Sequence, residues 1–137
     1  NLYQPTALFS DFIDEETIKL IENIQAKSLD ITKEIEIFKR TFDLLATFEG
    51  VESVFKKYYP AEDRFKGAFV ISNFEAIVPG VAKHIDYWEQ NKPLLLQRIK
   101  NMHSDERYKN YTKRGTRAFQ RALNMINFSP EYFSPNL

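Results

Sequence analysis

Apolar residues along the chain recur mainly at steps of three and four, which is the spacing of one face of an α-helix. A first helix is expected over residues 15–27, with Asp14 as its N-cap. The clearest amphipathic pattern begins at a cap provided by Asp30 or Thr32 and ends at Gly50, since glycine often terminates helices. No segment alternates convincingly between apolar and polar residues, so the pattern predicts an all-α protein.

The middle of the chain is predicted to hold a short helix, a polar loop and a longer kinked helix. The short helix covers residues 51–58 and ends before Pro60, because the residue before a proline avoids the α-helical region. Residues 60–66 then form an exposed loop. Ser72–Glu75 has the spacing of a capping box, so the central helix is expected to start there or slightly earlier. Pro79 lies inside that helix and is expected to kink it.

The remaining sequence predicts three more helices. One opens at Asn91 and includes Met102, a short one is capped by Ser104 and runs to Tyr111, and the last ends before Pro130. We therefore predict an irregular helical bundle of about six or seven helices with a kinked central helix. Its predicted core consists of Ile35, Phe38, Phe42, Phe74, Ile77, Val81, Ile85, Ile99 and Leu123.

Length and composition narrow the class of protein. With 137 residues, 43% of them hydrophobic, the chain can bury one core, so a single helical domain is expected over residues 1–137. The absence of cysteine excludes disulfides and thiolate metal sites and favours a reducing compartment such as the cytoplasm. No stretch is apolar enough to span a membrane. The chain begins without methionine or a signal-like segment, so we expect it to be a fragment of a longer polypeptide.

The net charge of the chain is zero, but its acidic and basic residues are distributed unevenly along the sequence. Residues 1–62 hold twelve acidic and seven basic residues, whereas residues 98–137 hold three acidic and eight basic ones. Cations neutralise phosphates, and the interleaved Tyr108 and Tyr111 have rings on which bases can stack. Alternatively, the basic residues pair with the acidic N-terminal helices, and the sequence leaves both readings open. The candidate nucleic-acid-binding residues are Lys109, Lys113, Arg114, Arg117 and Arg121.

Catalytic patterns are sparse, and no catalytic residue is assigned. The four glycines are too scattered to form a phosphate-binding or dinucleotide-binding loop, so no cofactor is expected. His84 and His103 each precede an aspartate by two residues, but positions two apart on a helix face different directions, so no metal site is predicted. Arg98 and His103 have the Arg-x4-His spacing of HEPN-type ribonucleases, although Ile99 stands where that family often has a polar residue.

The order of features between Phe38 and Phe133 resembles a known family. Its components are Phe38–Phe42, Val54–Tyr58, Arg64–Phe69, Ser72–Ala76, Gly80–Asp86, a Leu-rich helix, Tyr108–Thr112 and a basic helix with Arg117 and Arg121. This order resembles the helical C-terminal portion of GmrSD-type proteins, which are bacterial restriction and anti-phage defence factors. Pro79, inside the helix that carries Phe74–Ala76, departs from the pattern of that family.

The resemblance implies a longer protein in which catalysis belongs to another part. In that family the nucleotide-dependent chemistry resides in an N-terminal ParB/sulfiredoxin-like domain with an Asp-Gly-Gln-Gln-Arg type motif, which is absent here, so no catalytic residue can be carried over. The resemblance implies a non-catalytic helical module of a nucleotide-dependent nuclease, with that domain as one partner and DNA or RNA as another. The alternatives are a free-standing helical interaction domain and a HEPN-like ribonuclease.

Overall fold

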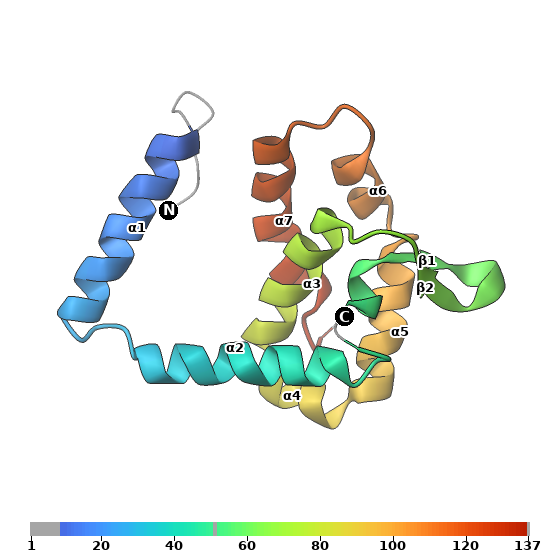
Figure 1. Cartoon of the computed structure of the whole chain (residues 1–137), viewed down its shortest axis with the longest axis horizontal. Helices are drawn as coiled ribbons and strands as arrows, with labels where there is room; N and C mark the ends of the chain where they lie inside the picture. Colours follow the sequence, from blue (N-terminus) through green and yellow to red (C-terminus); the bar gives the residue numbers. More distant parts are fainter. Residues whose placement is uncertain (1–8, 51, 137) are drawn as a thin grey trace. The chain divides into compact units, whose positions relative to one another are not determined.

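A computed structural model of the protein describes residues 9–50 and 52–136, and Figure 1 shows the helices and the small sheet within these ranges. The predicted all-α class and irregular helical bundle are confirmed. The elements are α1 (Phe9–Gln25), α2 (Ile31–Ala46), β1 (Lys57–Tyr59), β2 (Arg64–Lys66), α3 (Ile71–Lys83), α4 (Ile85–Gln90), α5 (Lys92–Met102), α6 (Glu106–Thr112) and α7 (Ala118–Tyr132). Two short 3-10 turns, η1 (Ser53–Phe55) and η2 (Pro60–Glu62), flank β1.

The chain groups into two compact units, Asn1–Glu36 and Ile37–Leu137, with the boundary inside α2. The smaller unit contains α1, on which Ile13, Ile18, Leu20 and Ile21 are exposed. That residues 1–137 form a single domain stays a prediction. None of the helices in the described ranges combines the length and apolar character needed to cross a bilayer.

The ends of the first two helices differ from the prediction. Asp14 lies inside α1 rather than at its N-cap. Asp30, one of the two proposed caps, does cap α2, because its carboxylate accepts a hydrogen bond from the Lys33 amide at 3.2 Å. Helix α2 ends at Ala46, and the Gly50 amide donates back to the Ala46 carbonyl at 3.1 Å.

The core of the larger unit is built around α3 and α7, which form its most extensive helix pair. Four of the predicted core residues are buried as expected, namely Ile77, Val81, Ile85 and Ile99. Trp88 and Phe133 are the largest fully buried side chains, and their rings meet edge-on with centroids 6.5 Å apart. The C-terminal segment therefore belongs to the core.

The prediction was wrong about which face of α2 is buried. Ile35 and Phe38 remain 55% and 61% exposed. The buried side chains of this helix are Thr41, Leu44 and Leu45. Helical spacing identifies apolar residues on a helix but not which of them find a partner. Three other predicted core residues, Phe42, Phe74 and Leu123, are only partly buried.

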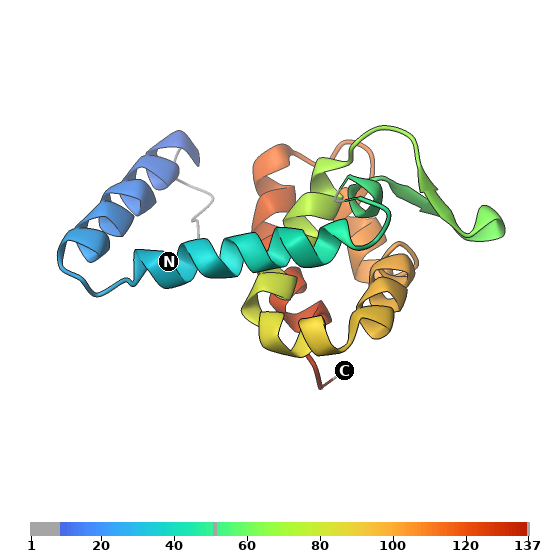
Figure 2. The same cartoon turned by 60° about the horizontal axis from the view of Figure 1, so that its bottom comes forward.

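Of the helix predicted over residues 51–58, residue 51 lies outside the described residues and only the 3-10 turn η1 forms, and a β-hairpin takes the place of its end and of the loop predicted over 60–66. Strands β1 and β2 pair antiparallel, with Tyr58 opposite Phe65. Asp63 adopts a left-handed conformation with φ of 46°, which lets the chain turn back. Each strand has three residues, too few for an alternating pattern to be recognised. The hairpin projects from the helices of the larger unit (Figure 2).

The central helix starts at Ile71, as expected, but without the predicted capping box. Ser72 Oγ lies 3.2 Å from the Tyr108 hydroxyl, and Glu75 binds Arg121, so both side chains are turned toward other helices. The helix is interrupted at His84, where the backbone has φ of −124° and ψ of 35°, before α4 begins. The long helix that we predicted is therefore divided in two.

A close contact with α7 surrounds the proline of α3. Pro79 has no amide proton, and the next residue, Gly80, donates its amide to Ser129 Oγ at 2.7 Å. The Ser129 hydroxyl in turn donates to the Ala76 carbonyl at 2.5 Å. It thus bridges two backbone groups that an ideal α-helix joins directly. A Cβ on Gly80 would lie 2.4 Å from the Ser129 carbonyl oxygen, so the absence of a side chain at Gly80 allows α7 to pack this closely against α3.

Two predicted boundaries near the C-terminus were wrong. Asp105, rather than Ser104, caps α6, because its carboxylate accepts hydrogen bonds from the amides of Arg107 and Tyr108 at 2.8 and 3.2 Å. Helix α7 continues through Pro130 to Tyr132 instead of ending before the proline.

Candidate nucleic-acid interface

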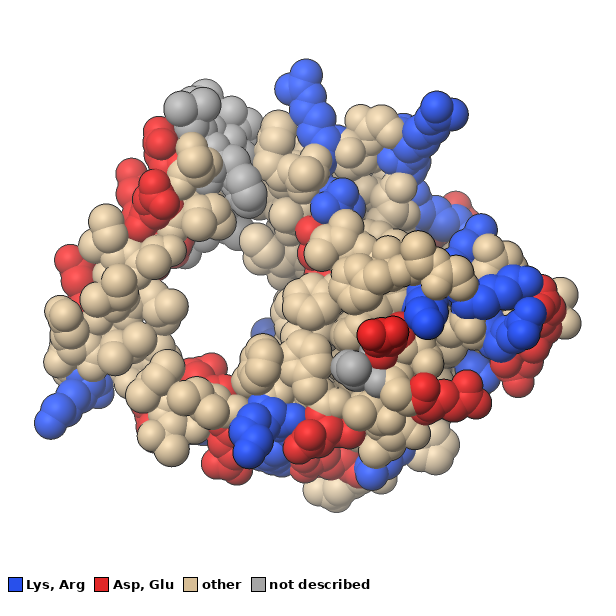
Figure 3. Space-filling view, viewed as in Figure 1, with Lys and Arg blue, Asp and Glu red and all other residues tan. Residues whose placement is uncertain are grey.

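The predicted basic residues gather around the connection between α6 and α7. Lys113, Arg114 and Arg117 are exposed there, and Figure 3 shows basic side chains projecting above these helices. Gly115 forms the turn with φ of 91°, a conformation that other residues rarely adopt. The backbone amide and the hydroxyl of Thr116 both donate to the Lys113 carbonyl, at 3.1 and 2.9 Å. The loop therefore has a defined shape that presents three cations together.

Helix α7 begins directly after this loop. Arg117 occupies its N-cap position in an extended conformation, and no side chain of the described residues caps it. The first amides of a helix have no intrahelical acceptor, and they carry the positive end of the helix dipole. The helix end and the three cations therefore attract an anionic group to the same place.

A pocket of about 450 Å³ opens beside the loop. This volume lies within the range of about 300–1,000 Å³ that is typical of small-molecule sites. Two of its lining residues are aromatic and the others are mostly polar or cationic. The lining consists of Asn110, Tyr111, Lys113, Gly115, Thr116, Arg117, Phe119, Gln120 and Asn124.

Arg121 differs from the other candidate residues because its guanidinium is already occupied. Its Nε and Nη2 atoms lie 2.7 and 3.1 Å from the two carboxylate oxygens of Glu75, and both side chains are only about one-fifth exposed. The hydrogen bonds to Glu75 raise the pKa of Arg121. Lys109 also has an acidic neighbour, Glu106, at 2.7 Å, but this pair is exposed. The ion pair of Arg121 with Glu75 thus joins α7 to α3 and neutralises the charge of Arg121.

The paired basic residues of α6 and α7 have acidic partners within the larger unit. Within the described residues, Arg107 pairs with Asp105 and Glu131, at 3.5 and 2.6 Å. The partners of Lys109 and Arg121 are Glu106 of α6 and Glu75 of α3. In the described part of the chain, Arg114 and Arg117 have no ion-pair partner, and the Lys113 amine donates to Asn110 Oδ1 at 3.1 Å.

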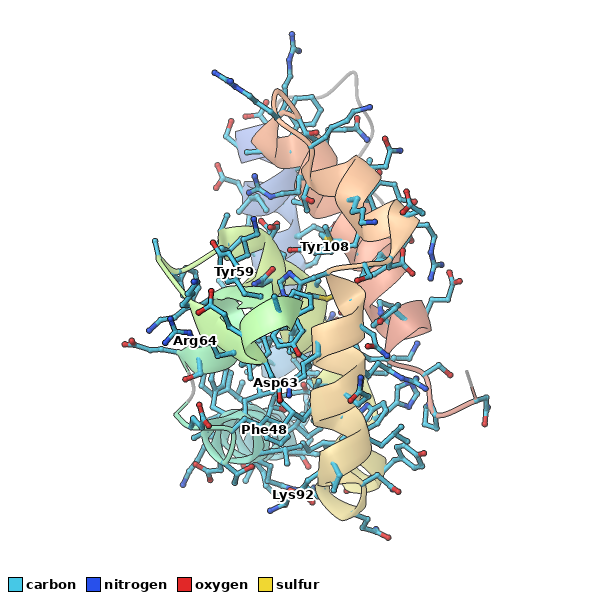
Figure 4. All side chains as sticks on the ribbon, turned by 90° about the vertical axis from the view of Figure 1, so that its right-hand side faces the viewer. Phe48, Tyr59, Asp63, Arg64, Lys92 and Tyr108 are labelled. Carbon is cyan, nitrogen blue, oxygen red and sulfur yellow. The ribbon has the colours of Figure 1, made fainter. Side chains whose placement is uncertain are left out.

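The two tyrosines proposed for base stacking have different surroundings. Tyr108 is 6% exposed, and its hydroxyl donates to Asn73 Oδ1 in the interior, so it cannot stack on a base (Figure 4). Burial raises the pKa of Tyr108. Tyr111 is partly exposed and lines the pocket, with its ring edge-on to Phe128 at 6.3 Å between centroids. Tyr111 therefore remains available as a stacking surface.

Arg98 and His103 do not share a site. Arg98 donates to the carbonyls of Tyr132 and Ser134, at 3.3 and 2.6 Å, and so fixes the C-terminal segment. His103 lies against the rings of Tyr58, Phe65 and Tyr108, and among the described residues its buried Nε2 atom has no hydrogen-bond partner. Burial, with a smaller effect of Lys57, lowers the pKa of His103 to about 4. These surroundings give no support to an acid or base that acts with Arg98.

The described residues contain no cluster of three His, Asp or Glu side chains suited to a metal ion. His84 is partly buried, which lowers its pKa, and it marks the break between α3 and α4.

Comparison with known proteins does not assign this chain to a family: no family, curated protein or solved structure matches it. The resemblance to GmrSD-type proteins thus stays a prediction.

Proposed function

We propose that this chain is a non-catalytic helical module that binds the phosphate backbone of nucleic acid through the α6–α7 loop. The observation that carries the proposal is the position of Arg114 and Arg117, which are exposed, without an ion-pair partner in the described residues, and next to the N-terminus of α7. Lys113 adds a third exposed cation. Arginine and lysine side chains and helix N-termini are the groups that most often contact phosphates.

Several other arginines of the larger unit support this choice by contrast. Arg40 binds Asp86 and Glu89, at 2.5 and 2.6 Å, and Arg121 binds Glu75. An arginine with a nearby carboxylate must give up that pair to bind a phosphate. The cations of the α6–α7 loop do not carry this cost, so a polyanion should bind there first.

The proposal extends to the longer protein through the GmrSD resemblance. In this view the module supports a nucleotide-dependent, ParB/sulfiredoxin-like N-terminal domain of a restriction or defence protein. The all-α fold and the order of the motifs between Phe38 and Phe133 support it. The test is the sequence that precedes Asn1 in the natural polypeptide, where a ParB-like domain is expected and any unrelated domain would contradict the assignment.

Binding is tested by fluorescence anisotropy with labelled oligonucleotides at low salt. Arg114→Ala combined with Arg117→Ala should weaken binding about tenfold or more, because two phosphate contacts are lost. The control combines Lys83→Ala with Lys92→Ala, which removes the same charge from exposed positions on α3 and α5. Equal losses in both double variants would point to net charge rather than to this loop.

A second function, protein interaction, is favoured by an aromatic face on the larger unit. Phe38 and Phe69 are 61% and 52% exposed. They are linked through Phe42 and Phe74, with successive ring centroids 4.7, 6.2 and 6.2 Å apart. Exposed apolar patches of this kind often mark protein contact sites. Slower hydrogen exchange at residues 38–42 and 69–74 in the full-length protein than in this chain would support the interaction, and equal exchange would oppose it.

A further inference from the structure

The pocket beside the α6–α7 loop combines features that a phosphate alone does not need. Tyr111 lines it with an aromatic ring, and Asn110, Gln120 and Asn124 line it with side-chain amides. An amide both donates and accepts hydrogen bonds, as the edges of nucleobases do. The lining therefore has the chemistry of base recognition next to the cations that attract phosphate.

The amides retain unused hydrogen-bonding groups. Gln120 Nε2 donates to Asn124 Oδ1 across one helical turn at 3.4 Å, which is long for a hydrogen bond. This contact leaves Gln120 Oε1 as an acceptor and Asn124 Nδ2 as a donor. Asn110 Oδ1 accepts from Lys113, which leaves its amide nitrogen as a donor. The pocket lining thus offers both an acceptor and donors.

A base can reach these groups only when it is unpaired. In a duplex the Watson–Crick edges and ring faces are covered by pairing and stacking, whereas single strands can turn a base outward onto an aromatic side chain. A pocket of about 450 Å³ is large enough for a ligand the size of one nucleotide.

We propose that this pocket takes one unpaired base of a single-stranded nucleic acid, with Tyr111 as its stacking surface, Gln120 and Asn124 on its edge, and Lys113 and Arg117 on the flanking phosphates. The inference rests on the proposed function, because it deepens the same site by naming the class of nucleic acid. DNA and RNA strands share this chemistry, and the experiment distinguishes them.

The experiment compares the affinity of the chain for four labelled probes of one length: single-stranded DNA, single-stranded RNA and duplex DNA of the same sequence, and an abasic strand. The single strands should bind about fivefold or more tightly than the duplex and the abasic strand, because stacking of one base contributes that much or more. The tighter of the two single strands shows whether the chain prefers deoxyribose or ribose.

Matched variants connect this preference to the pocket. Gln120→Ala combined with Asn124→Ala should reduce the preference for single strands, because the hydrogen bonds to the base edge are lost while stacking on Tyr111 remains, and it should leave the affinity for the abasic strand unchanged. The control, Gln97→Ala combined with Asn101→Ala, removes a similar amide pair with the same spacing from the exposed surface of α5 and should retain the preference. Equal thermal stability of the two variants shows that both fold.

The outcomes separate the two proposals. Equal affinity for all four probes, lost in the Arg114→Ala and Arg117→Ala variant, would overturn the base pocket and leave the phosphate-binding function standing. A preference of unchanged size in the Gln120→Ala and Asn124→Ala variant would also overturn the pocket. Failure to bind any probe would overturn both.

Discussion

Arg121 of α7 and Glu75 of α3 form a two-point ion pair, with N–O distances of 2.7 and 3.1 Å, across the main helix contact of the larger unit. The pair gives a structural role to a residue that the sequence had suggested for nucleic-acid binding. The pair is mostly shielded from solvent, since both side chains are about one-fifth exposed.

Arg121→Ala should therefore lower stability more than it lowers binding. Removal of one partner from a mostly buried pair leaves the other unpaired, so we expect a loss of about 1–3 kcal/mol in the free energy of unfolding. Adding Glu75→Ala should recover part of that loss, which a double-mutant cycle by urea unfolding measures. A stable Arg121→Ala variant with much weaker nucleic-acid binding would show that Arg121 belongs to the interface.

Ser129→Ala should destabilise the contact between α3 and α7. The variant leaves the Gly80 amide and the Ala76 carbonyl without the hydroxyl that now bridges them, which should cost about 1–3 kcal/mol. Ser104→Ala, at an exposed position, serves as the control and should change stability by less than about 0.5 kcal/mol. Thermal unfolding of the two variants compares them, and equal midpoints would argue against a bridging role for Ser129.

His103 should make the fold sensitive to acid. Burial lowers its pKa from 6.5 to about 4, so the unfolded state binds a proton more readily than the folded state between these values. Stability should consequently fall as the pH drops from about 6.5 to about 4, by on the order of 2 kcal/mol once partial solvent exposure is allowed for.

His103→Leu isolates this effect from the carboxylates that titrate in the same range. Glu62, Asp63 and Glu89 also have lowered pKa values because of their cationic partners, so both proteins should lose some stability in acid. Between pH 7 and pH 4.5, the free energy of unfolding should fall less in the variant than in the wild type, as urea unfolding at both pH values measures. Identical losses would mean that His103 binds a proton as readily in the folded protein as in the unfolded one.

The sequence predicted most helices because their apolar residues repeat at helical spacing, and local chemistry offered Asp30 as one of two possible caps for α2. It could not decide which apolar residues are buried. Phe38 and Leu45 lie on one helix, yet Phe38 is 61% exposed and Leu45 is fully buried, because burial depends on which other elements pack against each side. The β-hairpin escaped prediction because its strands are too short to show a period.

The candidate site was predicted in part. Local charge in the sequence identified Lys113, Arg114 and Arg117, which the structure places on one exposed loop. Distant partners were invisible, because Glu75 lies far from Arg121 in the sequence and Asn73 far from Tyr108. The pocket amides Gln120 and Asn124 were missed, although their spacing of four residues on a predicted helix already placed them on one face.

The salt dependence of nucleic-acid binding tests the central claim most directly. If Lys113, Arg114 and Arg117 each contact a phosphate, the logarithm of the binding constant should fall with the logarithm of salt concentration with a slope of about −2 to −3. Arg114→Ala combined with Arg117→Ala should reduce that slope by about 1.5, whereas Lys83→Ala combined with Lys92→Ala should leave it unchanged. A slope that is the same in all three proteins, or no binding at low salt, would contradict the account.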